Sequence, residues 1–254
     1  MDLIAGQLIR SYELIIRRAD QEAVDRYPKV PRYAIVNVEL GSSSLHVGDL
    51  TFLPGSSVPY HYHDAGSEET QILLSGVLEC WIDGKRTIVR GGDTVTAPPG
   101  IRHAFHNRTD TPARMVTAFP RTLPETVHVD DPELEDVAEH PAIIRAGTRI
   151  APYMAGVDGV ERVELSGEFS GAKSTYSYMV VIQPGAAVPV RRHDHDTALF
   201  VVEGPLSADL GDEEGVVLGE SDGAVVGPGE GYDLRNEGDS VARVIIIHPV
   251  LHPE

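Results

Sequence analysis

The chain has 254 residues, 41% of them hydrophobic, and its 39 acidic and 21 basic side chains give a formal net charge of −18. This composition is typical of a globular chain of one large or two small domains and argues against intrinsic disorder. The acidic excess is uneven, since residues 1–120 hold 12 basic and 14 acidic side chains whereas residues 121–254 hold 9 and 25. Such a surface repels phosphate backbones and anionic membranes, so we expect neither nucleic acid nor membrane as a partner.

No stretch of the sequence resembles a targeting or membrane-spanning segment. The apolar runs, such as residues 244–247, are far shorter than the roughly 20 residues that cross a bilayer. The N-terminus lacks the basic start and apolar core of a signal peptide. The single cysteine, Cys80, cannot form an internal disulfide. These features predict a soluble, cytoplasmic protein.

Residues 1–32 are predicted to form an N-terminal helical arm, because the apolar side chains between Leu3 and Ile16 recur at a helical spacing. The residue pattern then changes over residues 33–119. Short runs rich in Val, Ile, Thr and Tyr are separated every eight to twelve residues by Gly, Pro, Asn or Asp. Residues 150–254 have the same rhythm, which is typical of an all-β sandwich or barrel.

Residues 120–149 interrupt the β pattern and are predicted to link two domains. They contain four prolines and a short acidic segment, residues 132–139, that follows Asp131. Aspartate is a favoured helix N-cap. We therefore expect a linker that contains a short helix.

An internal repeat supports this division into two β domains. Eight residues of the first half have counterparts in the second half, in the same order and at offsets of 128 to 130 positions. The residues Gly55, His61, His63, Glu69, Gly76, Gly100, His103 and Asn107 correspond to Gly185, Arg191, His193, Thr197, Gly204, Gly229, Tyr232 and Asn236. Eight ordered matches indicate two copies of one domain, at residues 33–119 and 150–254.

The first copy carries residues that suit a metal site. Side chains two positions apart on a strand face the same side, so His61 and His63 can project together into a barrel. Glu69 and Gln71 can do so from the next strand, and His103 must then come from a third strand. Three imidazoles and a carboxylate suit a divalent transition metal. Gln71 can orient the carboxylate or a metal-bound ligand, or it can simply form hydrogen bonds with backbone groups of the barrel.

These residues resemble the two motifs of the cupin superfamily, and the repeat resembles a bicupin. The first motif is Gly, five residues, His-x-His, three or four residues, Glu, six residues, Gly; the second is Gly, five residues, Pro-x-Gly, two residues, His, three residues, Asn. Residues 92–107 match the second motif at every position. In the first motif, Glu68 has the required spacing from the histidines, whereas Glu69 has the required spacing from Gly76. We prefer Glu69, because a one-residue shift within a strand reverses the side chain's face, whereas an insertion in a loop costs little; Glu68 is the alternative.

The second copy departs from the motif at its ligands. Arg191, Thr197 and Tyr232 replace a histidine, the glutamate and a histidine, and only His193 stays in register. An arginine cannot lose its proton to bind a metal, so we expect no metal in this barrel. His195 faces away from His193 if the segment stays a strand; a register slip would instead create a two-histidine site. An organic anion could also bind to Arg191, His193 and Tyr232. Alternatively, these side chains simply pack in the barrel interior with hydrogen bonds to their neighbours.

The resemblance implies an all-β fold of two tandem cupin barrels, of the double-stranded β-helix or jelly-roll type, that associates as a homodimer. It implies one divalent transition metal per chain, Fe or Mn in preference to Zn, Ni or Co, held by His61, His63, Glu69 and His103. It also implies a small-molecule substrate. Superfamily activities include dioxygenation, decarboxylation, isomerisation, epimerisation and amine hydrolysis, besides plain binding roles.

Among these activities our first hypothesis is a dioxygenase that uses Fe(II) or Mn(II). Four protein ligands leave two positions of an octahedral metal for dioxygen and a chelating substrate. The alternatives are a non-redox isomerase or lyase, in which the metal polarises a carbonyl group, and a metal-bearing binding module without turnover.

Overall fold

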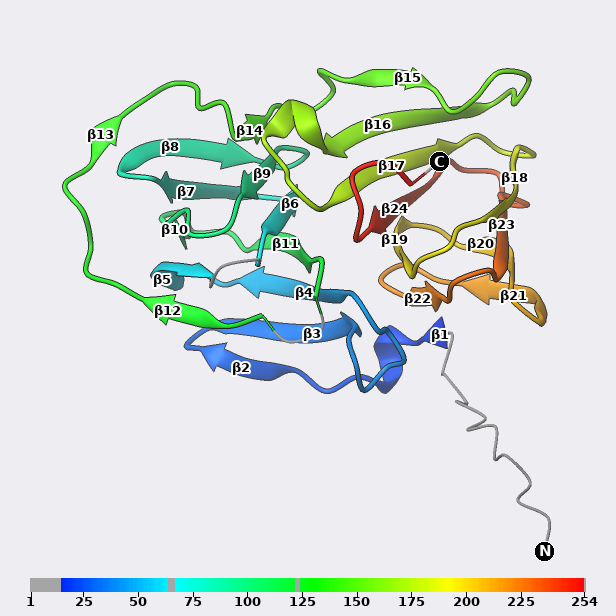
Figure 1. Ribbon diagram of the computed structural model, residues 1–254, viewed down its shortest axis with the longest axis horizontal. Helices are drawn as coiled ribbons and strands as arrows, with labels where there is room; N and C mark the ends of the chain where they lie inside the picture. Colours follow the sequence, from blue (N-terminus) through cyan, green and yellow to red (C-terminus); the bar gives the residue numbers. More distant parts are fainter. Residues whose placement is uncertain (1–14, 64–66, 122–123, 254) are drawn as a thin grey trace, which may run out of the picture.

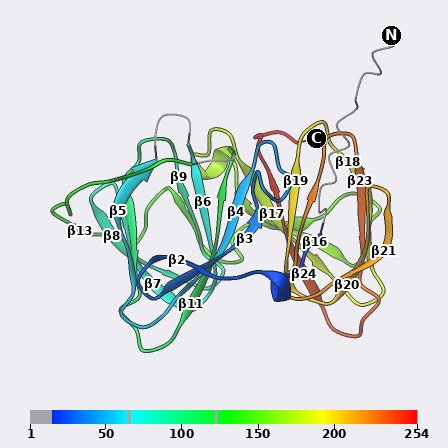
Figure 2. The same cartoon turned by 90° about the horizontal axis from the view of Figure 1, so that it is seen from below.

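The computed structural model describes residues 15–63, 67–121 and 124–253. Their strands form four mainly antiparallel sheets, arranged as two barrels side by side (Figures 1 and 2). These ranges include two short 3₁₀ turns, η1 (Arg18–Asp20) and η2 (Glu168–Ser170), and no α-helix. In the same ranges, no helix has the length and apolar character needed to span a bilayer. The predicted all-β tandem barrel fold is confirmed.

The first barrel is built from a seven-stranded and a six-stranded sheet. The first of these has the order β14 (Ile143–Ile144), β9 (Thr94–Ala97), β6 (Glu69–Ser75), β11 (Ala113–Phe119), β4 (His46–Phe52), β3 (Val30–Val36), β2 (Val24–Tyr27). The second has the order β12 (Thr126–His128), β5 (Ser57–His63), β10 (His103–His106), β7 (Val77–Ile82), β8 (Lys85–Arg90), β13 (Glu135–Asp136). Apolar side chains from both sheets, among them Phe52, Leu78 and Phe105, form one core cluster.

The second barrel has the same two-sheet design. Its larger sheet has the order β1 (Ile15–Ile16), β22 (Gly223–Val226), β19 (Thr197–Glu203), β24 (Ala242–His248), β17 (Tyr176–Ile182), β16 (Val160–Ser166), β15 (Ile150–Pro152). Its smaller sheet has the order β18 (Ala187–Arg192), β23 (Gly231–Arg235), β20 (Leu206–Leu210), β21 (Glu213–Leu218). Strand β1, the first in the described residues, therefore belongs to the second barrel.

Both faces of the large sheets are buried, which explains the apolar run at residues 244–247. Val244 and Ile246 pack in the core of the second barrel. Ile245 and Ile247 point to the other face and enter a cluster that contains residues of both barrels. Successive side chains of a strand face opposite sides, so a strand buried on both faces becomes apolar throughout. A shared hydrophobic layer therefore joins the two barrels.

Motif residues that are not predicted ligands shape turns of the barrels, and the motif asparagine does so in the same way in both. The amide of Asn107 donates to the carbonyl oxygens of Phe52 and Thr111, each at 2.8 Å. Asn236 makes the same pair of bonds in the second barrel, again at 2.8 Å. Gly76 turns the chain between β6 and β7 with a φ of +82°, and a Cβ there would lie 2.6 Å from the Ala113 backbone. Only glycine suits this turn.

The predicted helical arm at residues 1–32 is wrong from residue 15 onward, and residues 1–14 lie outside the described residues. Strand β1 pairs with β22 of the second barrel, with Ile15 opposite Ala224. Strand β2 pairs with β3. The backbone of this segment therefore pairs with β22, far along the chain, and with the neighbouring β3, and this strand pairing overrides a local helical spacing.

The short helix predicted within residues 132–139 is also absent. Glu135 and Asp136 form β13, which pairs in parallel with Lys85 and Arg86 of β8. Arg86 donates to the Asp136 carboxylate at 2.8 Å, and Lys85 pairs with Glu135 in the same way. These cross-strand pairs match acidic residues of the connection to basic residues of the barrel and favour the extended conformation.

Candidate metal centre

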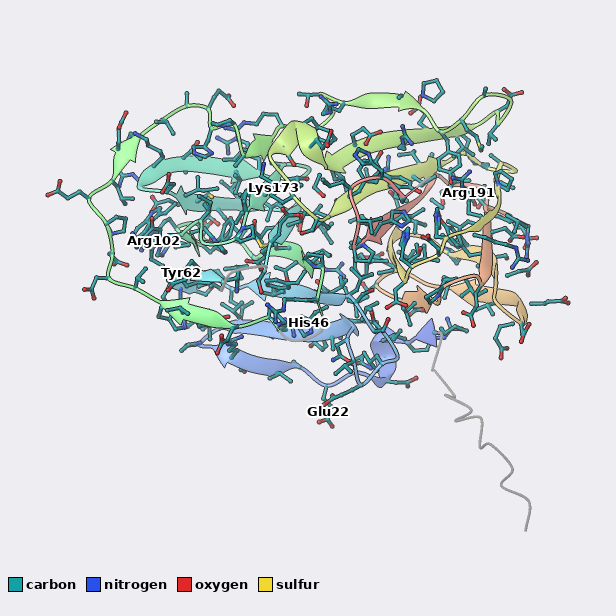
Figure 3. The ribbon with its side chains drawn as sticks, viewed as in Figure 1. Glu22, His46, Tyr62, Arg102, Lys173 and Arg191 are labelled. Atoms are coloured by element: carbon teal, nitrogen blue, oxygen red, sulfur yellow. The ribbon has the colours of Figure 1, made fainter. Side chains whose placement is uncertain are left out.

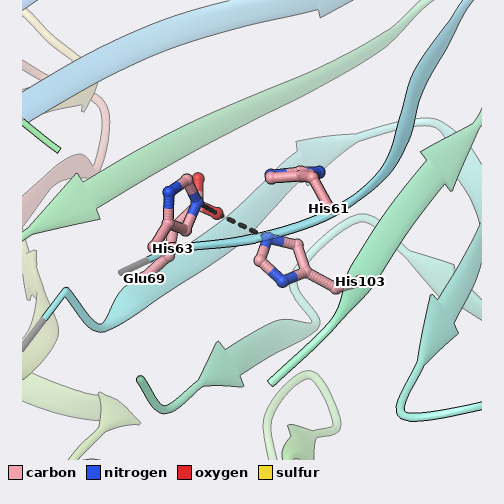
Figure 4. Close-up of side chains that lie close together, drawn as sticks. All are labelled: His61, His63, Glu69 and His103. Carbon is pink, nitrogen blue, oxygen red and sulfur yellow. Dashed lines mark hydrogen bonds and ion pairs between the residues drawn. The ribbon is translucent and has the colours of Figure 1, made fainter. Parts of the chain in front are cut away.

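The four predicted ligands converge inside the first barrel (Figure 4). His61 and His63 lie on β5 and His103 begins the adjacent strand β10, whereas Glu69 begins β6 in the opposite sheet. The Nε2 atoms of His63 and His103 lie 3.0 and 2.7 Å from Oε2 of Glu69. One nitrogen or oxygen atom from each of the four residues lies within 4.8 Å of the others. All four residues are buried.

The three histidines share one orienting contact, in which Nδ1 lies against a backbone carbonyl oxygen. For His61, His63 and His103 these oxygens belong to Pro59, Glu125 and Ile101, at 2.7, 2.7 and 3.1 Å. A carbonyl oxygen only accepts, so Nδ1 carries the hydrogen and the lone pair of a neutral ring is on Nε2. The barrel therefore holds these imidazoles in the form that binds metals.

The contacts with Glu69 test whether a metal fits this centre. Nε2 of His63 and of His103 faces a carboxylate oxygen at 3.0 and 2.7 Å, and either a proton on Nε2 or a metal ion bound by both partners makes such a contact favourable. Adjacent ligands of a metal with bonds of about 2.1 Å lie about 3 Å apart. The observed separations and the donor set of three imidazoles and one carboxylate both fit a divalent transition metal.

The charge state of the centre follows from its burial and its internal contacts. Burial by itself would raise the pKa of Glu69, but His63 and His103 hold that pKa well below its ordinary value. Burial would lower the pKa of His63, and the Glu69 carboxylate outweighs this and raises it. Burial, together with nearby His103, lowers the pKa of His61 to about 3. At neutral pH the centre thus offers a neutral imidazole at His61 and an ionised carboxylate.

Gln71 lies two residues after Glu69 on β6 and shares its face. Its Nε2 atom donates to Oε2 of Glu69 at 2.8 Å, and the side chain is buried. This bond holds the same carboxylate oxygen that faces His63 and His103. Such outer contacts commonly set the position of a metal ligand.

Glu68 occupies a different environment from Glu69. It is fully buried and accepts hydrogen bonds from the backbone N–H groups of Lys173, Ser174 and Thr175, with the last at 2.9 Å. Those residues precede β17 of the second barrel (Lys173 is labelled in Figure 3). The structure therefore brings Glu69 to the histidines and directs Glu68 to the other barrel.

A cavity of about 270 Å³ opens beside the four residues. Its wall is largely apolar and includes Leu50, Phe52, Val58, Phe105 and Met115. Two arginines, Arg26 and Arg32, also line it. Mostly apolar walls with a few convergent polar groups are typical of small-molecule sites.

Arg32 is a cavity residue that the sequence interpretation missed. Its guanidinium donates to Nε2 of His46 at 2.6 Å, and both side chains line the cavity (His46 is labelled in Figure 3). Burial lowers the pKa of Arg32, although the charge of Glu69 opposes this, and an arginine stays charged at neutral pH. Arg32 lies outside both motifs and within the segment predicted as an arm, so no local signal marked it.

The second barrel holds the counterpart residues in the same register but without the same donors. Tyr232 lies opposite Arg191, as His103 lies opposite His61 (Arg191 is labelled in Figure 3). The expectation that His195 faces away from His193 is wrong, because β18 ends at Arg192, before both histidines, and a continuing strand would also place side chains two positions apart on one face. The ring of His195 instead lies 5.3 Å from that of His193, measured between centroids.

The family follows from the sequence as well as from this geometry. The cupin domain family matches residues 48–119 and again residues 178–248. The chain belongs to the cupin family. The two matched regions of this cupin correspond to the two barrels, and the second of them lacks the usual ligand set.

Three curated relatives of this cupin come from Streptomyces. Protein SchB of Streptomyces halstedii is 32% identical over 102 residues, which cover 39% of this chain and 72% of SchB. Tetracenomycin polyketide synthase protein TcmJ of Streptomyces glaucescens is 31% identical over 106 residues, covering 40% and 69%. Polyketide synthase CurC of Streptomyces cyaneus is 32% identical over 117 residues, covering 44% and 75%.

Among solved structures, this cupin resembles oxalate decarboxylase from Bacillus subtilis. The two share 17% sequence identity at a TM-score of 0.74, over 96% of this chain and 78% of the other. A further structure of that decarboxylase, with a TM-score of 0.73, concerns its Mn(II) centers. At this identity the likeness establishes the tandem fold alone.

Proposed function

We propose that this cupin is a metal-dependent enzyme that acts on a small molecule in the first barrel. His61, His63, Glu69 and His103 would hold one divalent transition metal, with Fe or Mn preferred. The observation that carries the proposal is the convergence of three buried imidazoles and one carboxylate, with nitrogen–oxygen separations of 3.0 and 2.7 Å that fit neighbouring ligands of one ion. The Mn(II) centers of the structurally similar decarboxylase agree with this preference.

The substrate class follows from the cavity. A divalent metal and one carboxylate leave a net charge of +1, and Arg26 and Arg32 add further positive charge to the same wall. The rest of the wall is mainly apolar, with Phe52 and Phe105 among its members. We therefore propose a compact, largely apolar or aromatic substrate that carries an enolate, phenolate or carboxylate group. The polyketide synthase proteins among the relatives support a substrate of this kind.

Our first reaction class is oxygenation by a dioxygenase. A redox-active metal at this centre would supply electron transfer to dioxygen. Arg32 would bind the anionic group of the substrate, and the apolar wall would exclude water from the reacting carbon. Gln71 would keep Glu69 oriented as a ligand throughout the reaction.

The alternative is a non-redox isomerase or lyase reaction in the same cavity. The relatives whose names place them in polyketide synthases favour it, because polyketide chains carry carbonyl groups that a metal can polarise without a change of oxidation state. The substrate contacts would be the same in both cases. Only the dependence on dioxygen and on a redox-active metal differs.

The test starts with metal analysis of the purified protein by inductively coupled plasma mass spectrometry. Protein loaded with Fe(II), Mn(II) or Zn(II) is then offered a panel of hydroxylated aromatic acids and 1,3-dicarbonyl compounds in an oxygen electrode. Dioxygen uptake in step with substrate loss, absent with Zn(II), supports the dioxygenase. Equal turnover without dioxygen or with Zn(II) establishes the non-redox alternative, and ligand binding without turnover by any metal form indicates a binding module.

Two further proposals concern the state of the protein in the cell. Family resemblance favours a homodimer, which light scattering coupled to size-exclusion chromatography would test. The sequence favours a cytoplasmic location, which fractionation of cells that express the full chain would test.

A further inference from the structure

A second cluster of histidines lies in the second barrel, and only one of its members, His193, stands at a cupin ligand position. One ring nitrogen each from His193, His195 and His248 lies within 4.8 Å of the others. Centroid distances are 5.3 Å for His193 and His195, 4.7 Å for His193 and His248, and 5.2 Å for His195 and His248. His193 and His248 are buried, and the side chain of His195 is 12% exposed.

Two of these imidazoles are oriented as in the first barrel. Nδ1 of His193 donates to the carbonyl oxygen of Pro253 at 2.7 Å, and Nδ1 of His195 donates to the Asp194 carboxylate at 3.0 Å. With hydrogen on Nδ1, the lone pair of each neutral ring is on Nε2. A contact of this type with a carbonyl or carboxylate is the usual outer support of a metal-bound histidine.

The nitrogen atoms that remain lack a satisfactory set of partners. Nε2 of His193 is buried without a hydrogen bond, and so is Nε2 of His248. Nδ1 of His248 lies 3.1 Å from Nε2 of His195 and 3.4 Å from Oγ1 of Thr197, so Nδ1 is the His248 atom that faces the other two histidines. A hydrogen bond between the rings of His195 and His248 would explain their contact. It would still leave Nε2 of His193 buried without a partner, and buried polar atoms in proteins rarely lack a hydrogen bond.

His248 occupies a position where the first barrel has a different residue. It ends β24 as Phe119 ends β11, and the sequence offset of 129 matches that of the second motif. Phe119 packs edge-on against His63 with centroids 4.8 Å apart, and His248 packs edge-on against His193 at 4.7 Å. The second barrel thus keeps the ring packing but exchanges a phenyl group for a metal-binding imidazole.

We propose that His193, His195 and His248 form a second metal site, which takes a divalent ion that prefers imidazole, with Zn²⁺ as the best match. Ligands of a tetrahedral zinc with bonds of about 2.0 Å lie about 3.3 Å apart, close to the 3.1 Å between His195 and His248. Three ligands leave the fourth position to water or to an external ligand. The site contains no carboxylate ligand and so binds Zn²⁺ less tightly than the first centre. This proposal does not depend on the proposed function of the first barrel.

The test isolates the second site in the full-length chain. His61→Ala combined with His103→Ala removes two predicted ligands of the first centre. This background variant, stripped of metal, is then titrated with Zn²⁺ in an isothermal titration calorimeter. We expect it to bind about one Zn²⁺ ion per chain. Adding His195→Ala should weaken binding by at least about 100-fold, since loss of outer supports alone costs 10- to 100-fold.

Two more variants control for folding and for surface binding. His248→Phe installs the residue of the first barrel, so it should abolish Zn²⁺ binding while circular dichroism stays native. His252→Ala removes a histidine whose side chain is 76% exposed, and it should leave binding unchanged. The proposal is overturned if the folded background variant binds no Zn²⁺. It is also overturned if binding persists at full strength in both His195→Ala and His248→Phe.

Discussion

The two barrels share their structural residues and differ in their chemical ones. Glu68 of the first barrel and Asp196 of the second hold equivalent positions, each one residue before the motif position of Glu69 or Thr197. Glu68 accepts backbone N–H groups from the loop before β17, and Asp196 accepts them from Ser43 and Ser44, before β4, at 2.7 and 3.0 Å. Each barrel therefore binds a loop of the other through a buried carboxylate.

The ligand positions changed while this framework stayed. The first barrel keeps three histidines and Glu69 around one point, whereas the second places Arg191, Thr197 and Tyr232 at the corresponding positions. The comparison teaches that the pairing of the barrels and their metal chemistry depend on separate residues, even where these are neighbours in sequence. Substitutions at the two kinds of position should therefore have separable effects.

The largest effect is expected for Glu69→Ala. It removes the anionic member of the ligand set, so metal affinity should fall by more than about 100-fold and turnover should follow. The metal content of dialysed protein measures this directly. Full occupancy in Glu69→Ala, with loss of metal in Glu68→Ala, would reverse the assignment of the two carboxylates.

Glu68→Ala should act on stability and spare the metal. The substitution leaves buried N–H groups of the loop before β17 without an acceptor, which we expect to cost about 3 kcal/mol. Asp196→Ala should cost a similar amount, because its carboxylate also accepts from three serine hydroxyls. Urea unfolding measures both. Two unchanged midpoints would show that these carboxylates do not hold the barrels together.

Arg32→Met tests the positive charge of the cavity. Loss of a charged hydrogen bond to an anionic substrate should raise KM by about 10- to 100-fold, with metal content unchanged. Arg32→Lys should recover part of this loss because it keeps the charge. Steady-state kinetics with the substrate found in the panel give the answer, and an unaltered KM in Arg32→Met would remove Arg32 from the substrate site.

Gln71→Ala should have the smallest effect of the four. It deletes the bond that orients Glu69 but leaves every predicted ligand in place, so metal affinity should fall by about tenfold. Gln71→Glu provides a contrast, since a second carboxylate 2.8 Å from Glu69 would repel it in the absence of metal. Competition with a chelator of known affinity measures both variants. An effect as large as that of Glu69→Ala would contradict a purely orienting role.

The sequence allowed the tandem barrels and the first ligand set to be predicted because both depend on short-range rules. Strand alternation puts His61 and His63 on one face, and the turn geometry at Gly76 fixes the distance to Glu69. The choice of Glu69 over Glu68 followed from the same period of two residues. Local geometry, the internal repeat and the resemblance to the cupin motifs were together sufficient for these conclusions.

Other features were decided only by the tertiary structure, because they depend on which distant segments meet. Residues 15–27 form strands and a 3₁₀ turn rather than a helical arm, since strands from both barrels pair with them. Arg32 and His248 became visible only when long-range pairing brought them beside a cavity or a histidine cluster. His193 and His195 follow the end of β18 at Arg192, and only tertiary pairing brings them beside His248 at the end of β24.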